Sequence, residues 1–199
     1  MYFNELLFSK FLSVKEIAWL GVDFSLSKLT CEGFDISNEQ LHHCISDWNY
    51  LIISDQKKYD LRMAFRKPMM SSDLSVISKN NKYLKINNLS LSHISIQNQY
   101  SDDEIIKYAL SLDFEPKSEF SLFFIVESFD AKSKVASIWV VLMYLPVKSA
   151  VLCEKFLEIP SGIGLKNYWA RVFYNLIFHI QKSHFLRWKN LVNEPNQFN

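Results

Sequence analysis

Potential metal ligands gather in one stretch of the chain, at Cys31, His42, His43 and Cys44. Thiolates and imidazoles are the usual zinc ligands, and structural zinc sites present them as Cys-x2-4-Cys or His-x3-5-His pairs. These four residues form neither pair. Cys44 also falls on the apolar stripe of an expected helix, where a free cysteine behaves as a small hydrophobe. The sequence therefore predicts no metal ion and no cofactor.

A cysteine nucleophile needs a histidine beside it and an Asn or Asp that orients the histidine. Cys153 and His179 are candidates, but a chain with three Cys and five His offers such pairings without any specific spacing. His179 and His184 are five residues apart, which is not the i, i+4 pair of a helical metalloprotease site. We therefore expect no enzymatic activity and interpret both histidines as solvated residues.

Other charged or glycine-containing segments have ordinary structural explanations. Ser161–Gly164 lacks the Gly-x-Gly-x-x-Gly pattern of a phosphate-binding loop, so we interpret it as the turn into a helix. Asp102–Glu104 suit the first turn of a helix, where acidic side chains meet the positive end of the dipole. Arg62, Arg66 and Lys67 are too few for a nucleic-acid surface and are interpreted as a solvated face.

The composition limits the class of partner. The 199 residues carry 22 basic and 21 acidic side chains, so the net charge of +1 gives no reason to expect nucleic acid. At 49% hydrophobic residues, 1–199 is predicted to form a single domain. Only four glycines are present, which argues against turn-rich β folds and nucleotide loops. Protein partners are the expected class.

The location expected from the sequence is cytoplasmic. Three cysteines without the spacing of a secreted disulfide framework favour a reducing compartment. The first 20 residues mix apolar and charged side chains, unlike a signal peptide. The longest apolar run, 135–147, is shorter than the roughly 20 residues of a membrane span. Lys132, Lys134 and Lys148 flank it, so a peripheral membrane contact is the alternative to the buried core segment that we predict.

Helix starts are predicted at two capping patterns. Ser37 with Gln40 forms a capping box before a helix over about 38–53, and Ser101 caps a helix that ends near 112. A long amphipathic helix is predicted over Leu165–Trp188, because apolar residues recur there at three- and four-residue steps.

Two regions decide the fold class. The polar segment 71–99 alternates weakly, as a strand or a poorly ordered insert does. The apolar segment 120–146 suits either two buried strands around a turn at 130–134 or two short core helices. We predict a mainly α fold, a single-domain helical bundle with a short β element. The alternative is α+β, if 120–146 is a hairpin.

Five segments together carry a family resemblance. They are Leu6–Val14, Ile17–Leu20, Asp103–Leu110, an apolar segment that ends at Leu145–Pro146, and a last helix that ends in His184–Leu186. In these segments the chain resembles the accessory subunits of the type III secretion sorting platform, the SctK, OrgA and MxiK family. The resemblance implies a mainly helical, non-catalytic adaptor in the cytoplasm, at the inner face of the inner membrane.

The resemblance also implies partners. They are the C-ring components and the inner-membrane ring proteins of a secretion system, which the adaptor links. Nucleic acid and a membrane span are not expected, and any membrane association is peripheral, through the complex. A second interpretation is an immunity-type protein that binds and neutralises a cognate toxin.

The long C-terminal helix carries the expected partner-binding residues, because Trp, Tyr and Arg are frequent hot-spot residues. Trp169 and Phe173 are the first candidates, although their apolar stripe also suits closure of the protein's own core. That role moves the expected interface to the other side of the helix. The full set of candidates is Tyr168, Trp169, Arg171, Phe173, Phe178 and Lys182.

Overall fold

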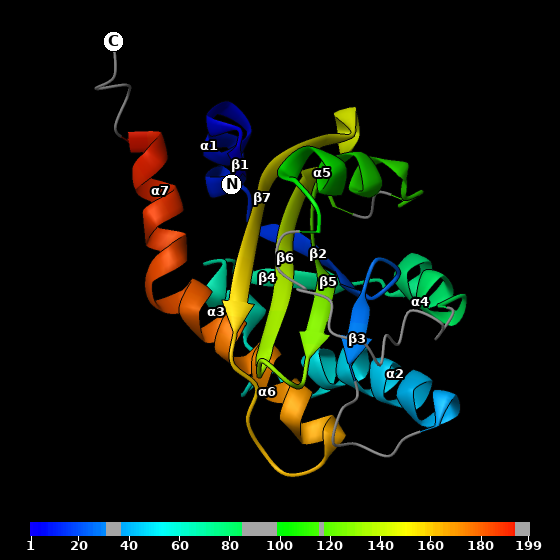
Figure 1. Ribbon diagram of the computed structural model, residues 1–199. Helices are drawn as coiled ribbons and strands as arrows, with labels where there is room; N and C mark the ends of the chain where they lie inside the picture. Colours follow the sequence, from blue (N-terminus) through cyan, green and yellow to red (C-terminus); the bar gives the residue numbers. More distant parts are fainter. Residues whose placement is uncertain (31–36, 85–98, 116–117, 194–199) are drawn as a thin grey trace.

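The computed structural model describes residues 1–30, 37–84, 99–115 and 118–193. These residues form a seven-stranded mixed sheet with helices packed against it (Figure 1). The strand order is β1-β7-β6-β5-β2-β4, and β3 pairs with β5 further along its length. The strands are β1 (Tyr2–Phe3), β2 (Glu16–Asp23), β3 (Lys28–Thr30), β4 (Met69–Ser72), β5 (Phe120–Asp130), β6 (Val135–Tyr144) and β7 (Ser149–Glu158).

The centre of the sheet is an antiparallel meander of β5, β6 and β7. These strands are rich in Phe, Val, Ile and Leu, and almost every residue of β5 and β6 is buried. The sheet is thus covered on both faces, which removes the polar alternation that marks a half-exposed strand. β2 pairs with β5 in parallel and β4 pairs with β2 in parallel, so the N-terminal part of the chain extends the sheet at one edge.

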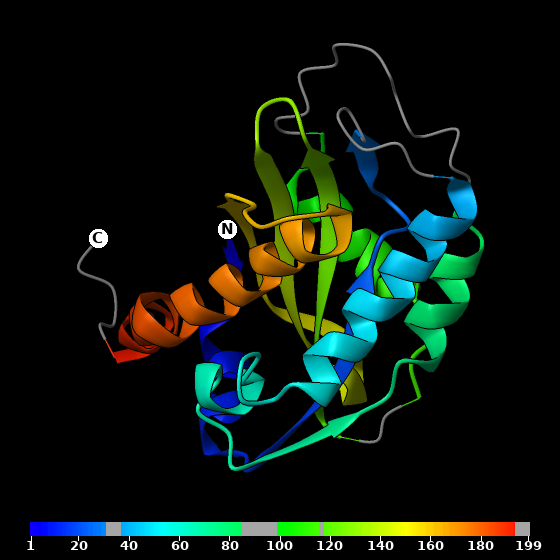
Figure 2. The ribbon, with the colours of Figure 1, turned by 90° about the horizontal axis from the view of Figure 1, so that it is seen from below.

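Two apolar cores flank the sheet. The larger core includes buried residues of α1 (Glu5–Ser13), α2 (Asn38–Ser54), α3 (Leu61–Ala64), α6 (Leu165–His179) and α7 (Phe185–Asn193). A π-helical turn, Ile180–His184, joins α6 to α7. The smaller core, on the other face, contains Ile77 of α4 (Ser75–Lys82) and Ile105 of α5 (Asp102–Ser111). Figure 2 shows α6 and α2 on the same side of the sheet.

The prediction of a mainly α helical bundle is wrong, because the chain has an α+β fold built on one sheet. The segment 120–146 is the β5–β6 hairpin, whose strands pair from Phe120 with Tyr144 to Asp130 with Val135. Ile17–Leu20 belongs to strand β2, and 149–158 forms a third central strand. Buried apolar runs fit strands and core helices equally well, so periodicity did not separate the two.

The predictions based on local capping are confirmed. Ser37 with Gln40 and Ser101 with Glu104 form complete capping boxes at the starts of α2 and α5. The last helix also exists, and its helical turns continue through the π-helical segment to Asn193. Within the polar segment 71–99, strand β4 ends at Ser72 and residues 75–82 form helix α4. The alternating runs that suggested a strand or a poorly ordered insert fall within 85–98, outside the described residues.

The apolar run 135–147 is a buried strand followed by a short 3-10 turn, Leu145–Val147, as expected for a core segment. No helix in the described part of the chain combines the length and the apolar character that crossing a membrane requires.

Candidate functional site

Helix α6 has a buried side that fixes its position on the sheet. It begins after Gly164, whose φ of 76° lies in the left-handed region that glycine adopts without strain. Trp169 stacks on Phe129 of β5 with ring centroids 4.2 Å apart and an angle of 7° between the planes. Trp169 is 2% exposed and Phe173 is 1% exposed. These two candidate contacts therefore lie in the protein's own core and leave no surface for a partner.

The outer side of α6 carries two stacked aromatic rings with a cation at each end. The guanidinium carbon of Arg171 lies 4.4 Å from the ring centroid of Tyr174, and Nζ of Lys182 lies 5.4 Å from that of Phe178. The two rings stack on each other at 6.2 Å and 13°. Lys58, from the loop after α2, approaches Tyr174 at 5.9 Å. The quadrupole of an aromatic ring attracts a cation that lies over its face. These contacts therefore hold the cations and the rings in place on the surface of α6.

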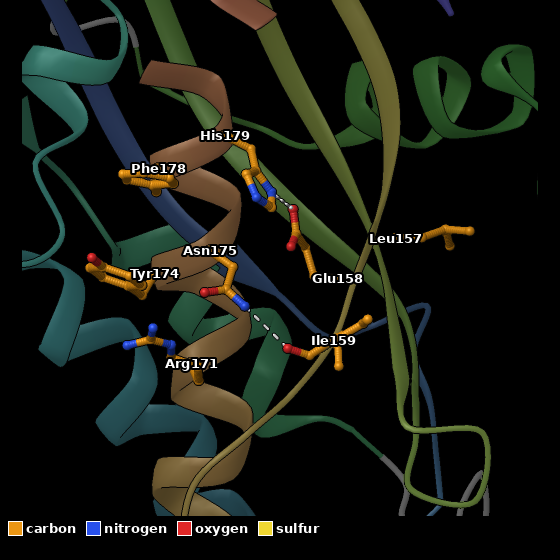
Figure 3. A pocket seen from close by; sticks show the side chains of 8 residues that line it. All are labelled: Leu157, Glu158, Ile159, Arg171, Tyr174, Asn175, Phe178 and His179. Carbon is orange, nitrogen blue, oxygen red and sulfur yellow. Dashed lines mark hydrogen bonds and ion pairs between the residues drawn. The ribbon is translucent and has the colours of Figure 1, made fainter. Parts of the chain in front are cut away.

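A groove of about 400 Å³ lies between this side of α6 and the end of β7. Figure 3 shows Arg171, Tyr174, Asn175, Phe178 and His179 arranged along successive turns of α6. The opposite wall consists of Glu158 and Ile159, and Nδ2 of Asn175 donates to the carbonyl oxygen of Ile159 at 3.1 Å. Leu157 points away from α6 (Figure 3).

Apolar side chains are exposed along this groove. Ile159 is 67% exposed and Phe178 is 40% exposed. Scattered apolar residues are normal on a surface, but a concave site with an apolar rim is where partners bind. The exposed residues of the sequence-predicted set, Arg171, Phe178 and Lys182, lie on or beside this groove.

An ion pair forms the polar part of the groove. Nδ1 of His179 lies 2.8 Å from Oε1 of Glu158, whose side chain is only 4% exposed, whereas half of the His179 side chain is exposed. Burial raises the pKa of Glu158, and the hydrogen bond and charge of His179 act in the opposite direction. Together with Arg171 and Asn175, the half-exposed His179 gives the groove a polar side that can orient a bound chain, and Glu158 holds His179 in place.

The two thiols in the described part of the chain, Cys44 and Cys153, are not activated as nucleophiles. Burial raises the pKa of both Cys153 and Cys44, the reverse of the shift that makes a cysteine reactive. Cys153 belongs to the smaller core, whereas His179 belongs to α6 on the other face of the sheet, so the pair considered from sequence does not form.

The residues considered as zinc ligands do not form a described site. Within 1–30, 37–84, 99–115 and 118–193 no group of three or more His, Cys, Asp or Glu side chains could hold a metal ion. Cys31 lies outside the described residues. His43 pairs with Glu39 on the exposed surface of α2.

One candidate from the sequence, Tyr168, and three groove residues that the sequence analysis did not name remain to be placed. Tyr168 is half-buried and meets Trp169 edge to face, with centroids 5.1 Å apart. Tyr174 and Asn175 were missed, although they lie three and four residues after Arg171 and could have been found by following the helix surface. Ile159 was missed because the strand that ends beside it was not predicted.

The basic cluster Arg62, Arg66 and Lys67 does not form the solvated face expected from sequence. Lys67 is 5% exposed, and its Nζ donates to the carbonyl oxygens of Phe11 and Val14. Arg62 and Arg66 are exposed, and Nη2 of Arg66 donates to the carbonyl oxygen of Gln181 at 3.2 Å. The cluster thus joins the end of α1 to the π-helical turn.

Comparison with known proteins gives no family. No family model and no curated protein matches the chain. Among solved structures, the C-terminal domain of LpoB from Salmonella enterica is 11% identical, with 77% of this chain and 93% of that chain aligned and a TM-score of 0.28. Lipoprotein GNA1162 from Neisseria meningitidis is 7% identical, with 85% and 99% aligned and a TM-score of 0.35.

The hypothetical protein CT253 from Chlamydia trachomatis is 11% identical, with 90% of this chain and 94% of that chain aligned and a TM-score of 0.32. TM-scores of this size do not define a common fold. No function is transferred from these three proteins.

Proposed function

We propose that this chain is a non-catalytic adaptor that binds another protein through the groove between α6 and β7. The observation that carries the proposal is the pair of exposed apolar side chains, Ile159 and Phe178, on the rim of a concave site. Helix and strand hold both walls, so binding requires little ordering of the site. Aromatic anchors in such sites supply most of the binding free energy of protein interfaces.

The specific adaptor role that we propose is that of an accessory subunit of a type III secretion sorting platform, at the cytoplasmic face of the inner membrane. It would link C-ring components to the inner-membrane ring. Support comes from the sequence resemblance. Three of its segments coincide with helices, α1, α5 and the helical region that continues into α7. The mixed sheet replaces the mainly helical fold that the resemblance implied.

The test compares two matched surface variants of the full chain. Phe178→Asp places a charge in the groove, whereas Leu186→Asp alters an apolar side chain that is 59% exposed on α7, outside the groove. Both variants and the wild type are tagged, expressed in the native organism and purified with their bound proteins. Thermal unfolding of each variant shows whether it is folded.

We expect C-ring and inner-membrane ring proteins to co-purify with the wild type and with Leu186→Asp, and to be lost with Phe178→Asp. Secretion through the system should fall with Phe178→Asp only. Equal recovery of these proteins with both folded variants would refute binding through the groove. Recovery of a toxin in their place would refute the secretion role and support the immunity-type interpretation.

A further inference from the structure

The groove residues and their neighbours form a surface that we call the cation–aromatic ladder, defined as Lys58, Arg171, Tyr174, Phe178 and Lys182. We propose that this ladder recognises an acidic segment of the partner protein that also inserts one apolar side chain into the groove. The inference rests on the proposed function and names the chemistry of the partner.

The positive charge of the ladder is not neutralised locally. Lys58, Arg171 and Lys182 are exposed, and none of them forms an ion pair within the part of the chain that the structure describes. Elsewhere lysines do pair with carboxylates, as Lys166 does with Asp47 at 2.7 Å. Since the whole chain has a net charge of only +1, these three cations are a local excess.

The acidic groups near the ladder do not cancel this excess. Burial is the main cause that raises the pKa of the Tyr59 phenol, the charge of Asp55 adds to it, and Arg171 acts in the opposite direction. Glu158 is buried against His179 and is not presented to a ligand. Arg66 is a further exposed cation near the ladder. Its guanidinium donates a hydrogen bond to the carbonyl oxygen of Gln181, the residue before Lys182. An approaching surface therefore meets cations first.

Carboxylates fit this arrangement. The cations are spaced along one helix, with Arg171 and Lys182 eleven residues apart, about three turns. An acidic peptide lying along α6 can meet both of them, and such complementarity raises the association rate and excludes basic partners. The groove between them, about 400 Å³ in volume, is large enough for a Leu or Phe side chain beside Phe178 and Ile159.

The geometry favours a protein segment over an anionic membrane. A membrane-binding surface inserts its aromatic rings into the lipid, with the basic residues at the headgroups. Here the face of Tyr174 is covered by Arg171, and Phe178 is stacked between Tyr174 and Lys182. The faces of both rings are thus occupied by each other and by the cations, and are not free to enter a lipid layer.

The test is a selection from a phage library of random dodecapeptides on three immobilised full-length proteins. They are the wild type, the charge-reversed ladder R171E/K182E, and a control with the same change in net charge, K107E/K189E, on exposed lysines of α5 and α7. Circular dichroism and thermal unfolding verify that all three proteins are folded.

We expect the wild type and the control to select peptides that combine Asp or Glu with Leu, Phe or Trp, and the ladder variant to lose this preference. The affinity of a selected peptide should fall about tenfold or more on R171E/K182E and weaken as salt is added. Phe178→Ala should lower the affinity for the same peptide, while Leu186→Ala should leave that affinity unchanged. Replacing its acids by amides should remove most of the binding.

Selection of neutral or basic peptides, selection of none, or equal weakening by the control would overturn the inference. Binding of phosphatidylglycerol vesicles that is lost on R171E/K182E, without acidic peptides, would overturn it in favour of a membrane. Loss of the native partner on Phe178→Asp, together with selected peptides that are not acidic, would leave the proposed function standing and refute only the acidic character of the bound segment.

Discussion

The buried amine of Lys67 gives a prediction whose size can be worked out. Its side chain is 5% exposed, and its Nζ lies 2.9 Å from the carbonyl oxygen of Val14 and 3.9 Å from the ring centroid of Phe11. Burial lowers the pKa of this amine from 10.5 to about 8. Between these two values Lys67 binds more protons in the unfolded chain than in the folded protein, so its contribution to the free energy of unfolding rises with pH.

The magnitude follows from the same two values. The difference between 10.5 and about 8 corresponds to about 3.4 kcal/mol over the whole titration, at about 1.36 kcal/mol per pKa unit. Linkage places about 2 kcal/mol of that rise between about pH 7 and about pH 9.5. This pH range ends below 10.0, the ordinary pKa of tyrosine. Burial raises the pKa of Tyr59 to about 12, so above pH 10 the unfolded chain loses this proton first and the protein becomes less stable.

The assay is urea unfolding, followed by tryptophan fluorescence, at several pH values in this window. Lys67→Met removes the amine and keeps the length of the side chain, and Lys189→Met removes an exposed lysine of α7 as the control. From about pH 7 to about pH 9.5 the wild type and the control should gain about 2 kcal/mol relative to Lys67→Met. Parallel profiles for all three proteins would refute the assignment of a depressed pKa to Lys67.

Three further predictions concern stability. Trp169→Ala should lower the free energy of unfolding by about 3–5 kcal/mol in urea melts, and Phe178→Ala by about 1 kcal/mol or less, because only the first side chain is fully buried; similar losses would contradict this assignment. Gly21→Ala should cost about 1–3 kcal/mol in the same assay, since its φ is +114° and the new Cβ would lie 2.7 Å from Oδ1 of Asn49; an unchanged melt would contradict it. Because the pKa of Glu158 is raised above 4.5, stability should fall as pH rises from that value through the folded pKa, and Glu158→Gln should remove this fall; a fall that persists in the variant would assign it to another group.

The parts of the fold that could be predicted depend on neighbours in sequence. The capping boxes at Ser37 and Ser101 join residues three apart, so their patterns were sufficient to locate the starts of α2 and α5. The hairpin of β5 and β6 depends on pairing between distant residues, and both faces of its strands are buried. A strand buried on both faces loses the alternation by which a sequence reveals it.

The contrast between local and distant contacts also explains which residues of the site could be predicted. Arg171, Phe178 and Lys182 could be assigned to the outer side of a helix from its period alone. The burial of Lys67 could not be predicted, because lysine is usually exposed and its acceptors, the carbonyl oxygens of Phe11 and Val14, are more than fifty residues away. The groove also requires the end of β7, a strand that was not predicted from the sequence.

Helix α6 can combine core packing with the binding role that we propose, because its two stripes have different chemistry. The inner stripe packs Trp169 and its apolar neighbours into the core, which fixes the rotation of the helix on the sheet. Once that rotation is fixed, the steps of three and four residues from Arg171 through Tyr174 and Phe178 to Lys182 must form a line on the outer side. We therefore expect substitutions in the outer line to alter the proposed binding surface while the inner stripe keeps the fold. If the proposed binding holds, stability and binding are separable within this one helix.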